Sequence, residues 1–399
     1  MSWTARRLNQ LGYLSRGRSR HRPRDAVHLY NGPYPFVQTG DVKHAGLYIT
    51  DYEQTYSEAG LEQSRLWPAG TLCITIAANI ADTAILAIDG CFPDSVIGFI
   101  PDEKKADARF VKYLFDATIQ QRVQQFTQGA AQDNLSQEKL LSIDFAVPDV
   151  TEQKRIADVL SAYDDLIENN RRRMALLEEA ARQLYREWFV RFRFPGHEHT
   201  RITNGVPQGW ERNRLEQLTS FLNRGIAPYY DDDAEGLVIN QKCIRAGRLD
   251  LSRARHQSRE FKADQQVQRG DVLVNSTGEG TLGRIAQVLA PIDNCTVDTH
   301  VTIVRPALGI GIHYFGQALM EWEPMFSTMG RGATNQTELS RRQIGEVQIL
   351  VPHRSLVQQF DEFAHSAIRQ VWVLMEQNEK LCAARDLLLP RLMSGQLAV

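Results

Sequence analysis

The chain has 399 residues, too many for one ordinary domain, and its 43% hydrophobic content is high enough for folded cores. Its five cysteines form no C-x-x-C pair, which argues against a disulfide framework or a zinc site, and no histidine spacing suggests another metal. With no membrane-spanning stretch, this cysteine usage predicts a cytoplasmic protein. The net charge is only −2, but lysine supplies nine of the 46 basic residues, so arginine, which forks onto phosphate and guanine, dominates.

The first 24 residues contain seven arginines and no acidic residue, which alone would suggest a targeting peptide. That interpretation is disfavoured because the segment has a counterpart about 200 residues later, within a duplicated sequence. The matching pairs are WTARRLNQL at 3–11 with WERNRLEQL at 210–218, FVQTGDVKHAG at 36–46 with VINQKCIRAG at 238–247, AGTLCIT at 69–75 with RGDVLVN at 269–275, and GAAQDNLSQEKLLSIDFAVP at 129–148 with GATNQTELSRRQIGEVQILVP at 332–352. This period is too long for a solenoid and indicates that a whole unit was duplicated.

Each copy contains a globular segment, predicted at 1–148 and 195–353. Short runs of Val, Ile, Thr and Phe are broken there by Gly, Pro, Asn and Asp, as is typical of strands joined by turns. One helical stretch is expected in each segment, at 107–126 and at 311–329. We therefore expect two homologous domains of α/β (or α+β) class.

A long amphipathic helix follows each globular segment, predicted at 149–194 and 354–399, with Asp149 and Glu152 as a candidate capping box for the first. Its apolar positions are separated by steps of four and three residues, the period of a coiled coil. This seam comprises Ile156, Leu160, Tyr163, Ile167, Asn170, Met174, Leu177, Ala181, Leu184 and Trp188 in the first helix, and Phe360, Ala364, Ala367, Val371, Leu374, Asn378, Leu381, Arg385, Leu388 and Leu392 in the second.

Two such helices in one chain can pair antiparallel and relate the domains by a pseudo-two-fold axis. Symmetric pairing brings Asn170 opposite Asn378, and a buried asparagine pair is a device that fixes register. The same register pairs Tyr163 with Arg385 in a cation–π contact, and Trp188 with Phe360. A shift by one heptad would also join the seams. The simpler arrangement, a helix lying on its own domain, is disfavoured because about 40 residues span about 60 Å.

The stretch STGEGTLG at 276–283 contains a formal match to the dinucleotide-binding G-x-G-x-x-G motif. That fold needs a helix directly after the glycines, whereas RIAQVLA at 284–290 is β-branched and alternating, as in a strand. We therefore expect a tight turn or a close backbone approach. A P-loop and the catalytic tetrapeptide of base methyltransferases are also absent from the sequence.

Five segments together resemble the specificity subunit of type I restriction-modification systems. They are GRSRHRPRDAVHLYNGPYPFVQTGDV at 17–42, WFVRFRFPGHE at 188–198, GDVLVNSTGEGTLGRIA at 270–286, RGATNQTELS at 331–340 and LLLPRLMSGQL at 387–397. The resemblance implies two target recognition domains, each reading half of a split, asymmetric site in double-stranded DNA, with the paired helices as spacer. One departure is TIAANIADTAI at 75–85, which stands where the second copy has its glycine-rich loop.

The resemblance also implies a non-catalytic subunit that carries no cofactor or metal of its own. Such a subunit docks two modification subunits, which hold S-adenosylmethionine and methylate adenine. Two restriction subunits add translocation and cleavage driven by ATP with magnesium. A recognition subunit of a methyltransferase-only complex is the nearest competing interpretation. Less favoured are a nucleotide-binding enzyme built on GEGTLG and a nucleic-acid binder that is indifferent to sequence.

Candidate DNA contacts are polar and basic residues on loops, since Arg, Asn and Gln bind phosphate and base edges. In the first domain they are Arg16, Arg18, Arg20, Arg22, Gln38, Thr39, Gln128 and Gln132; in the second they are Arg224, Tyr229, Asn240, Lys242, Arg245, Ser276, Thr277, Arg331, Asn335 and Gln336. Replacing Arg331 with alanine is expected to weaken recognition of one half-site only. The cluster at 171–173 could face modification subunits, spacer DNA or solvent.

Overall fold

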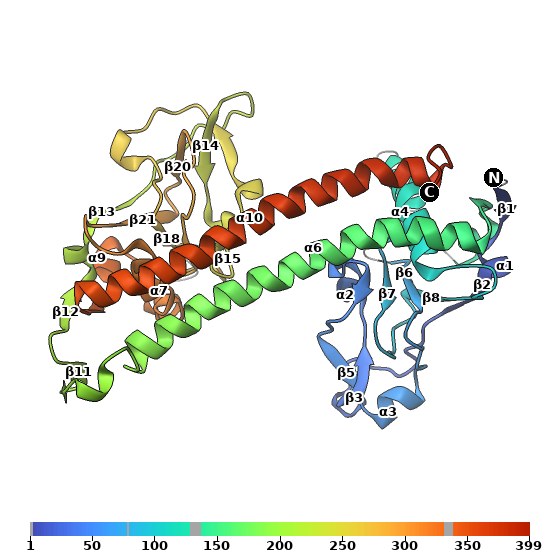
Figure 1. Cartoon of the computed structure of the whole chain (residues 1–399), viewed down its shortest axis with the longest axis horizontal. Helices are drawn as coiled ribbons and strands as arrows, with labels where there is room; N and C mark the ends of the chain where they lie inside the picture. Colours follow the sequence, from blue (N-terminus) through green and yellow to red (C-terminus); the bar gives the residue numbers. More distant parts are fainter. Residues whose placement is uncertain (1–2, 78–79, 128–136, 331–337) are drawn as a thin grey trace. The chain divides into compact units, whose positions relative to one another are not determined.

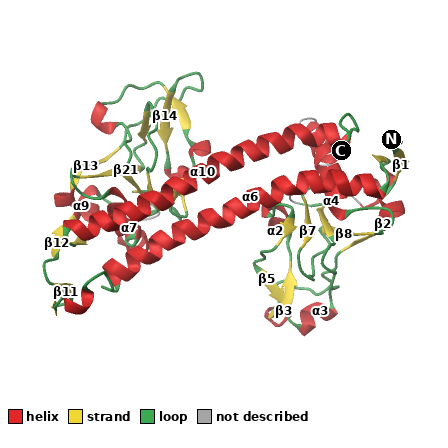
Figure 2. Ribbon diagram, viewed as in Figure 1, coloured by secondary structure: helices red, strands yellow, loops and turns green. Residues whose placement is uncertain are grey.

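A computed structural model describes residues 3–77, 80–127, 137–330 and 338–399. The chain divides into two compact units, which we call unit 1 (Met1–Arg173 with Val373–Val399) and unit 2 (Met174–Trp372). Each unit consists of one β-rich domain and one end of each of two long helices, α6 (Val150–Tyr185) and α10 (Arg354–Met393) (Figures 1 and 2). The units therefore do not separate the helices from the globular segments.

The domain of unit 1 is a five-stranded sheet in the order β2-β8-β6-β7-β4, with the pairs β3-β5 and β1-β9 beside it. Helix α4 covers one face, and the turn-rich segment around α2 covers the other, so the central strands are buried on both sides. The elements are β1 (Thr4–Arg6), α1 (Leu8–Leu11), β2 (Gly12–Arg16), β3 (Tyr30–Phe36), α2 (Thr39–His44), β4 (Tyr48–Ile49), β5 (Gln54–Tyr56), α3 (Glu58–Glu62), β6 (Leu72–Thr75), β7 (Thr83–Leu86), β8 (Val96–Pro101), α4 (Ala108–Thr127), α5 (Gln137–Ser142) and β9 (Phe145–Val147).

The domain of unit 2 has a four-stranded sheet in the order β13-β21-β18-β19 and a three-stranded sheet β17-β14-β20. Its elements are β10 (Ile202–Thr203), β11 (Val206–Pro207), β12 (Glu211–Arg214), β13 (Thr219–Arg224), β14 (Gly236–Ile239), β15 (Ile244–Arg245), β16 (Arg248–Leu249), β17 (Arg255–Gln257), β18 (Val272–Asn275), β19 (Ile285–Gln287), β20 (Cys295–Val297), β21 (Val301–Pro306), α7 (Ile312–Met320), α8 (Glu323–Met329), α9 (Arg341–Gly345) and β22 (Gln348–Val351). The single helix expected at 311–329 is two helices, because Pro324 suits only the first turn of a new helix.

The two domains repeat one topology, as the duplicated sequence predicts. The order β2-β8-β6-β7 in unit 1 matches β13-β21-β18-β19 in unit 2, and β1-β9 matches β12-β22. Glycine is required at the same point in both. A Cβ on Gly17 would lie 2.3 Å from the Phe92 carbonyl oxygen, and one on Gly225 would lie 1.7 Å from that of Val297. The fold is therefore mixed α/β and duplicated.

The predicted seam is the packed face of both helices, since none of its twenty positions is exposed. Asp149 immediately precedes α6 and caps it, since its Oδ1 accepts hydrogen bonds from the amides of Thr151 and Glu152, each at 3.0 Å. In unit 1, Asn170 Nδ2 donates to Asn378 Oδ1 at 2.9 Å, the partner that the symmetric register gives. Asp164, which precedes Asn170 on α6, pairs with Arg385, which follows Asn378 on α10, so the helices are antiparallel there. The pseudo-two-fold relation between the domains stays a prediction.

Two other predicted seam contacts differ in the structure. The Arg385 guanidinium pairs with Asp164 at 2.5 Å and with Asp386 at 2.8 Å, and no cation–π contact with Tyr163 is found among the described residues, because carboxylates compete for the guanidinium. In unit 2, the rings that contact Phe360 are Tyr185 and Phe189, and within the described part of this unit Trp188 makes no ring contact with it. Here α6 ends in a π-helical turn, Arg186–Val190, whose extra residue per turn advances the phase.

Candidate nucleic-acid interface

An arginine-rich loop follows β2 in unit 1. Arg16 Nε donates to the Asp94 carbonyl at 2.9 Å, and Arg22 Nη1 donates to the carbonyls of Ser19 and His21 at 2.7 Å. These carbonyl bonds orient the side chains but leave their charges uncompensated. Arg18 and Arg20 are exposed, and their side chains have no carboxylate partner within the described residues. The four predicted arginines therefore lie at the end of β2 and on the loop that follows it, and together they form a cationic surface that suits a polyanion.

Beside this loop, an exposed aromatic side chain is stacked with an arginine. The Arg65 guanidinium lies 5.0 Å from the ring centroid of Tyr13 and 4.1 Å from that of Trp67, and its Nη1 donates to the Tyr13 hydroxyl at 2.8 Å. Tyr13 is 50% exposed, and side-chain hydrogen bonds with Ser15 and Arg65 lower its pKa. The sequence prediction missed this surface because its members are about 50 residues apart in the chain.

Two predicted amide contacts are at equivalent positions in the two units, each just before a helical turn. Gln38 precedes α2, and its Nε2 donates to Gln54 Oε1 at 2.7 Å; Thr39, the first residue of α2, is half-buried. Asn240 accepts from the Lys242 amide at 2.8 Å and donates to the Arg253 carbonyl at 2.9 Å. Both ends of the Asn240 amide are thus used within the domain, so base contact there would require breaking these bonds.

The predicted contacts of unit 2 divide into available and unavailable side chains. Tyr229 is 63% exposed, and Lys242 and Arg245 are also exposed. Arg224 is half-buried and pairs with Glu338 at 2.7 Å, which compensates its charge. Five predicted contacts lie outside the described residues: Gln128, Gln132, Arg331, Asn335 and Gln336.

The contact predicted for Ser276 is wrong. Its side chain is fully buried, and its Oγ is 2.5 Å from Thr302 Oγ1, inside the sheet. It continues the line of β18, so its side chain is directed into the core. The next residue, Thr277, is half-buried, and its hydroxyl lies 2.6 Å from His300 Nδ1.

The glycine-rich stretch is the turn of a β18–β19 hairpin, as predicted, with Val272 opposite Gln287. Gly278, Gly280 and Gly283 have φ of 105°, 71° and 78°, a conformation that favours glycine. A Cβ on Gly283 would lie 2.5 Å from the Ser327 amide nitrogen in α8, so that glycine also permits close packing. A helix does not follow the glycines, and the dinucleotide interpretation fails on this geometry.

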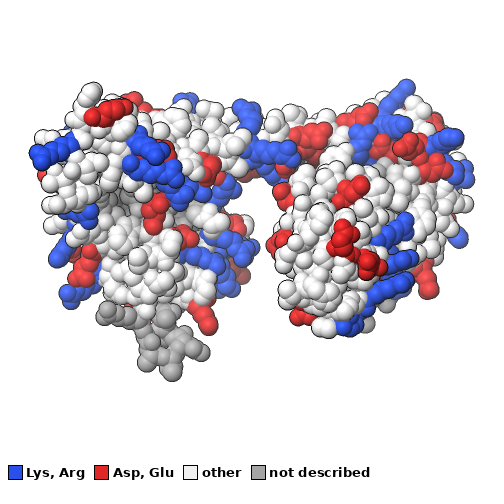
Figure 3. All heavy atoms as spheres, turned by 90° about the horizontal axis from the view of Figure 1, so that it is seen from below, with Lys and Arg blue, Asp and Glu red and all other residues white. Residues whose placement is uncertain are grey.

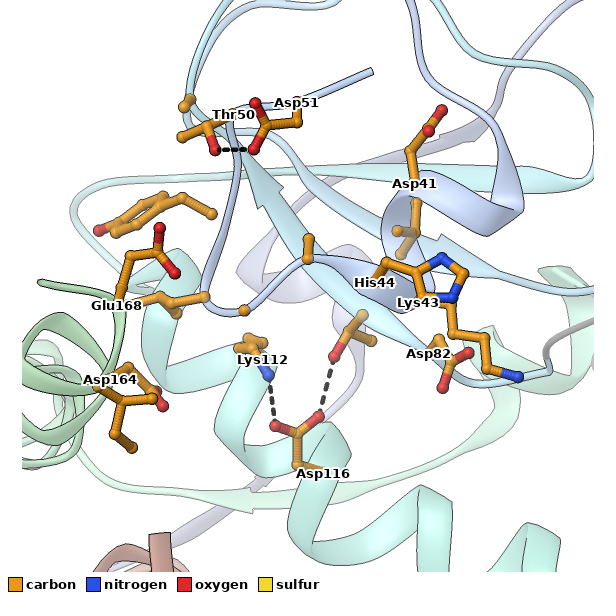
Figure 4. A pocket seen from close by; sticks show the side chains of 18 of the residues that line it. Asp41, Lys43, His44, Thr50, Asp51, Asp82, Lys112, Asp116, Asp164 and Glu168 are labelled. Atoms are coloured by element: carbon orange, nitrogen blue, oxygen red, sulfur yellow. Dashed lines mark hydrogen bonds and ion pairs between the residues drawn. The ribbon is translucent and has the colours of Figure 1, made fainter. Parts of the chain in front are cut away.

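The large cavity of unit 1 has a different character (Figure 4). It has a volume of about 1560 Å³ and is lined by α2, the loop after it, α4 and the ends of α6 and α10 in this unit. Nine carboxylates and five Lys or Arg side chains line it. Some are paired with each other, such as Lys112 with Asp116 at 2.5 Å, and Thr83 also donates to Asp116 at 2.9 Å. An excess of carboxylates repels phosphate, so the nucleic-acid candidates are the exposed loops and not this cavity.

Figure 3 shows Lys and Arg side chains over the visible surface of both units, with Asp and Glu between them. Within the residues that the structure describes, no cluster of His, Cys, Asp or Glu could hold a metal ion. The helices of that part of the chain include none that is long and apolar enough to cross a membrane.

Comparisons with known proteins agree on one family. Residues 2–179 match the model of the type I restriction modification DNA specificity domain. The chain is 24% identical to the type I restriction enzyme MjaIX specificity subunit of Methanocaldococcus jannaschii, over 100% of this chain and 94% of that relative. It is 19% identical to the HindI specificity subunit of Haemophilus influenzae, over 91% and 94%.

A solved structure shares the fold over nearly the whole length. The crystal structure of the type I restriction-modification system S subunit from M. genitalium superimposes with a TM-score of 0.61 at 15% identity, covering 98% of this chain and 96% of that one. The duplicated domains, the two long helices and the full-length match to specificity subunits lead to one assignment. The chain is similar over its whole length to the DNA specificity subunits of type I restriction-modification systems, and residues 2–179 match the model of their specificity domain.

Proposed function

We propose that this chain reads a split, asymmetric site in double-stranded DNA, with one half-site read by each β-rich domain. The observation that carries the proposal is one topology present twice with different exposed side chains around it. Unit 1 presents the loop with Arg18 and Arg20, whereas unit 2 presents Tyr229, Lys242 and Arg245. A shared scaffold with unlike surfaces suits two half-sites of unlike sequence.

The helices α6 and α10 act as the spacer in this proposal. They also carry exposed large apolar side chains, and such side chains on a protein surface often mark a site where a partner protein binds. Leu166 and Leu387 in unit 1 are 50% and 67% exposed, and Leu176 in unit 2 is 69% exposed. We assign these positions to the docking of two modification subunits, which bring S-adenosylmethionine. Two restriction subunits, which bring ATP and magnesium, complete the complex.

The state of the cysteines supports a cytoplasmic location. All five are free, and burial raises the pKa of the Cys295 thiol to about 12 and that of Cys91 to about 11. Such thiols are inert and need no oxidising compartment, which supports action in the cytoplasm.

The alternative is a recognition subunit of a methyltransferase-only complex, which would have the same surfaces. Expression with and without the restriction subunit distinguishes this alternative from a complete restriction-modification complex.

The test is the methylation pattern of DNA in a host that carries this chain with its modification subunits. The expected result is adenine methylation in a split motif with a spacer of fixed length. A contiguous motif, or no motif, would contradict the proposal. The matched control is the same host with the modification subunits alone, which should produce no motif.

A variant with longer helices tests whether α6 and α10 act as the spacer. Insertion of one heptad into each helix, within the seam, keeps the coiled-coil phase and lengthens each helix by about 10 Å. That length corresponds to about three base pairs at 3.4 Å. The two half-sites should keep their sequence while the spacer lengthens. An unchanged spacer in a methylating complex would show that the helices do not set it.

A further inference from the structure

Two tyrosine–arginine stacks lie side by side on the surface of unit 2. The Arg255 guanidinium is 3.6 Å from the ring centroid of Tyr230, and the Arg259 guanidinium is 5.1 Å from that of Tyr229. Both rings face solvent, since Tyr229 is 63% and Tyr230 is 46% exposed. Both arginines are also exposed. Two exposed aromatic rings, each stacked with a cation, are more typical of a binding surface than of a surface that contacts only solvent.

The backbone holds the two stacks in place. The loop before β14 is joined to β17 by the bridge between Tyr230 and Gln257 and by two hydrogen bonds, from the Ser258 amide to the Tyr229 carbonyl at 2.9 Å and from the Asp231 amide to the His256 carbonyl at 3.2 Å. One N–H of Arg259 is also fixed, because Nη1 donates to the Ala227 carbonyl at 2.8 Å. The arginines are thus ordered before any ligand arrives, which reduces the entropy lost on binding.

Their charges are uncompensated, unlike those of neighbouring arginines. In unit 2, Arg224 pairs with Glu338, Arg248 with Glu178 and Arg253 with Asp250. Arg255 and Arg259 make no ion pair within the described part of the chain. Glu235 and Glu260 line the same pocket as Arg259, and Asp231 follows Tyr230 in the chain, but none of these carboxylates forms an ion pair with either arginine in the described part of unit 2.

We propose that Arg255 and Arg259 form a phosphodiester clamp that anchors DNA beside the half-site of unit 2; this inference rests on the proposed function. A guanidinium stacked on a ring keeps its edge N–H groups free, and that planar fork matches two phosphate oxygens. Tyr229 and Tyr230 act as positioning residues. Phosphate contacts hold the register of a protein on the duplex and carry no base information.

The experiment uses the assembled complex with its modification subunits and measures binding to two labelled duplexes, one with the methylated motif and one with random sequence, over a range of salt. The variants are Arg255→Gln, Arg259→Gln and both together, because glutamine keeps most of the stem on the ring and removes the charge. The matched control is Arg248→Gln, an exposed arginine that is already paired with Glu178. Circular dichroism checks that all variants fold.

Each clamp variant should weaken binding roughly ten-fold on both duplexes. It should also lower the slope of log affinity against log salt by about 0.9, and the double variant by about twice that. The control should change neither. Tyr230→Ala should weaken binding less than Arg255→Gln, and Tyr230→Phe should retain it because the ring remains.

An unchanged salt slope, or a loss no larger than that of the control, would overturn the clamp. Loss of discrimination between the two duplexes at an unchanged slope would also overturn it, in favour of base reading. The proposed function has a separate criterion, which is that the unmodified complex prefers the motif duplex. If that preference is absent, the slopes on random duplex still decide whether the clamp exists.

Discussion

The asparagine pair between α6 and α10 in unit 1 gives the sharpest test of the packing. Asn170 is only 6% exposed and donates to Asn378 Oδ1, while Asn378 Nδ2 donates to the Ile167 carbonyl at 3.2 Å. Their surroundings are apolar seam positions. The perturbations are Asn170→Leu, Asn378→Leu and the two combined, in the full-length chain.

The magnitudes follow from what each change leaves unpaired. Asn378→Leu removes two hydrogen bonds and strands the buried amide of Asn170, which costs about 1–3 kcal/mol of unfolding free energy. Asn170→Leu should cost less, because Asn378 is only half-buried and keeps its bond to Ile167. The double variant strands no side-chain amide and adds apolar burial, so its stability should equal or exceed that of the parent. The coupling between the sites should therefore be on the order of 1–3 kcal/mol.

The assay is denaturant unfolding followed by far-ultraviolet circular dichroism, which is dominated by the helices. Stability differences come from the transition midpoints, and the slope reports whether the native state is still unique. A lower slope in the double variant would fit the loss of a register-fixing pair. Single variants as stable as the parent, or a double variant destabilised by the sum of the singles, would refute the reasoning.

Three further predictions concern stability. Gly225→Ala should lower the melting temperature strongly, because its Cβ would lie 1.7 Å from the Val297 carbonyl oxygen, whereas the control Gly40→Ala meets no atom within 4 Å. Asp271→Asn should lower the free energy of unfolding by about 3–5 kcal/mol, since it leaves Arg305, 13% exposed, without its buried partner. The control Asp94→Asn, which breaks the exposed pair with Arg24, should lower it by less than about 1 kcal/mol in the same thermal assay. Burial, with His365 and Arg269 nearby, lowers the pKa of His313 to about 4, so the unfolded chain binds a proton there that the native state refuses. Stability should therefore fall between about pH 6.5 and 4, by at most about 3 kcal/mol, and His313→Leu should remove that part of the decline; parallel pH profiles for variant and parent would contradict this.

The architecture was predictable because the sequence contains two kinds of repeat, a 3.5-residue apolar period and the duplication of a whole domain. A 3.5-residue repeat identifies a helix face wherever it occurs, and all twenty seam positions are indeed covered. The duplication likewise shows in the matching segments, and the structure adds a matched requirement for glycine at Gly17 and Gly225. The phase error at Trp188 has a local cause, because a single π-helical turn advances a helix without any periodic sign in the sequence.

The interface was predictable by residue type but not by residue. The sequence does not show whether the charge of an arginine is uncompensated, as for Arg255, or compensated by a carboxylate, as for Arg224. Which state it takes depends on a carboxylate more than a hundred residues away in the latter case. Ser276 shows the same limit. The chain continues in the direction of β18 for one more residue, so the Ser276 hydroxyl is directed into the core and not to the surface. The tyrosine–arginine stacks join residues from separate strands and loops, so no linear motif announces them.

Equivalent positions with unlike electrostatics are the reason to expect an asymmetric site. Arg16 and Arg224 end the equivalent strands β2 and β13, each directly before the glycine of the shared close approach. Arg16 is held by a main-chain carbonyl and keeps its charge, whereas Arg224 is compensated by Glu338. Two domains with one scaffold and one arginine at the same place thus have different electrostatic fields around that position. If duplication alone governed recognition, the half-sites would be copies; the observed divergence at matched positions predicts that they are not.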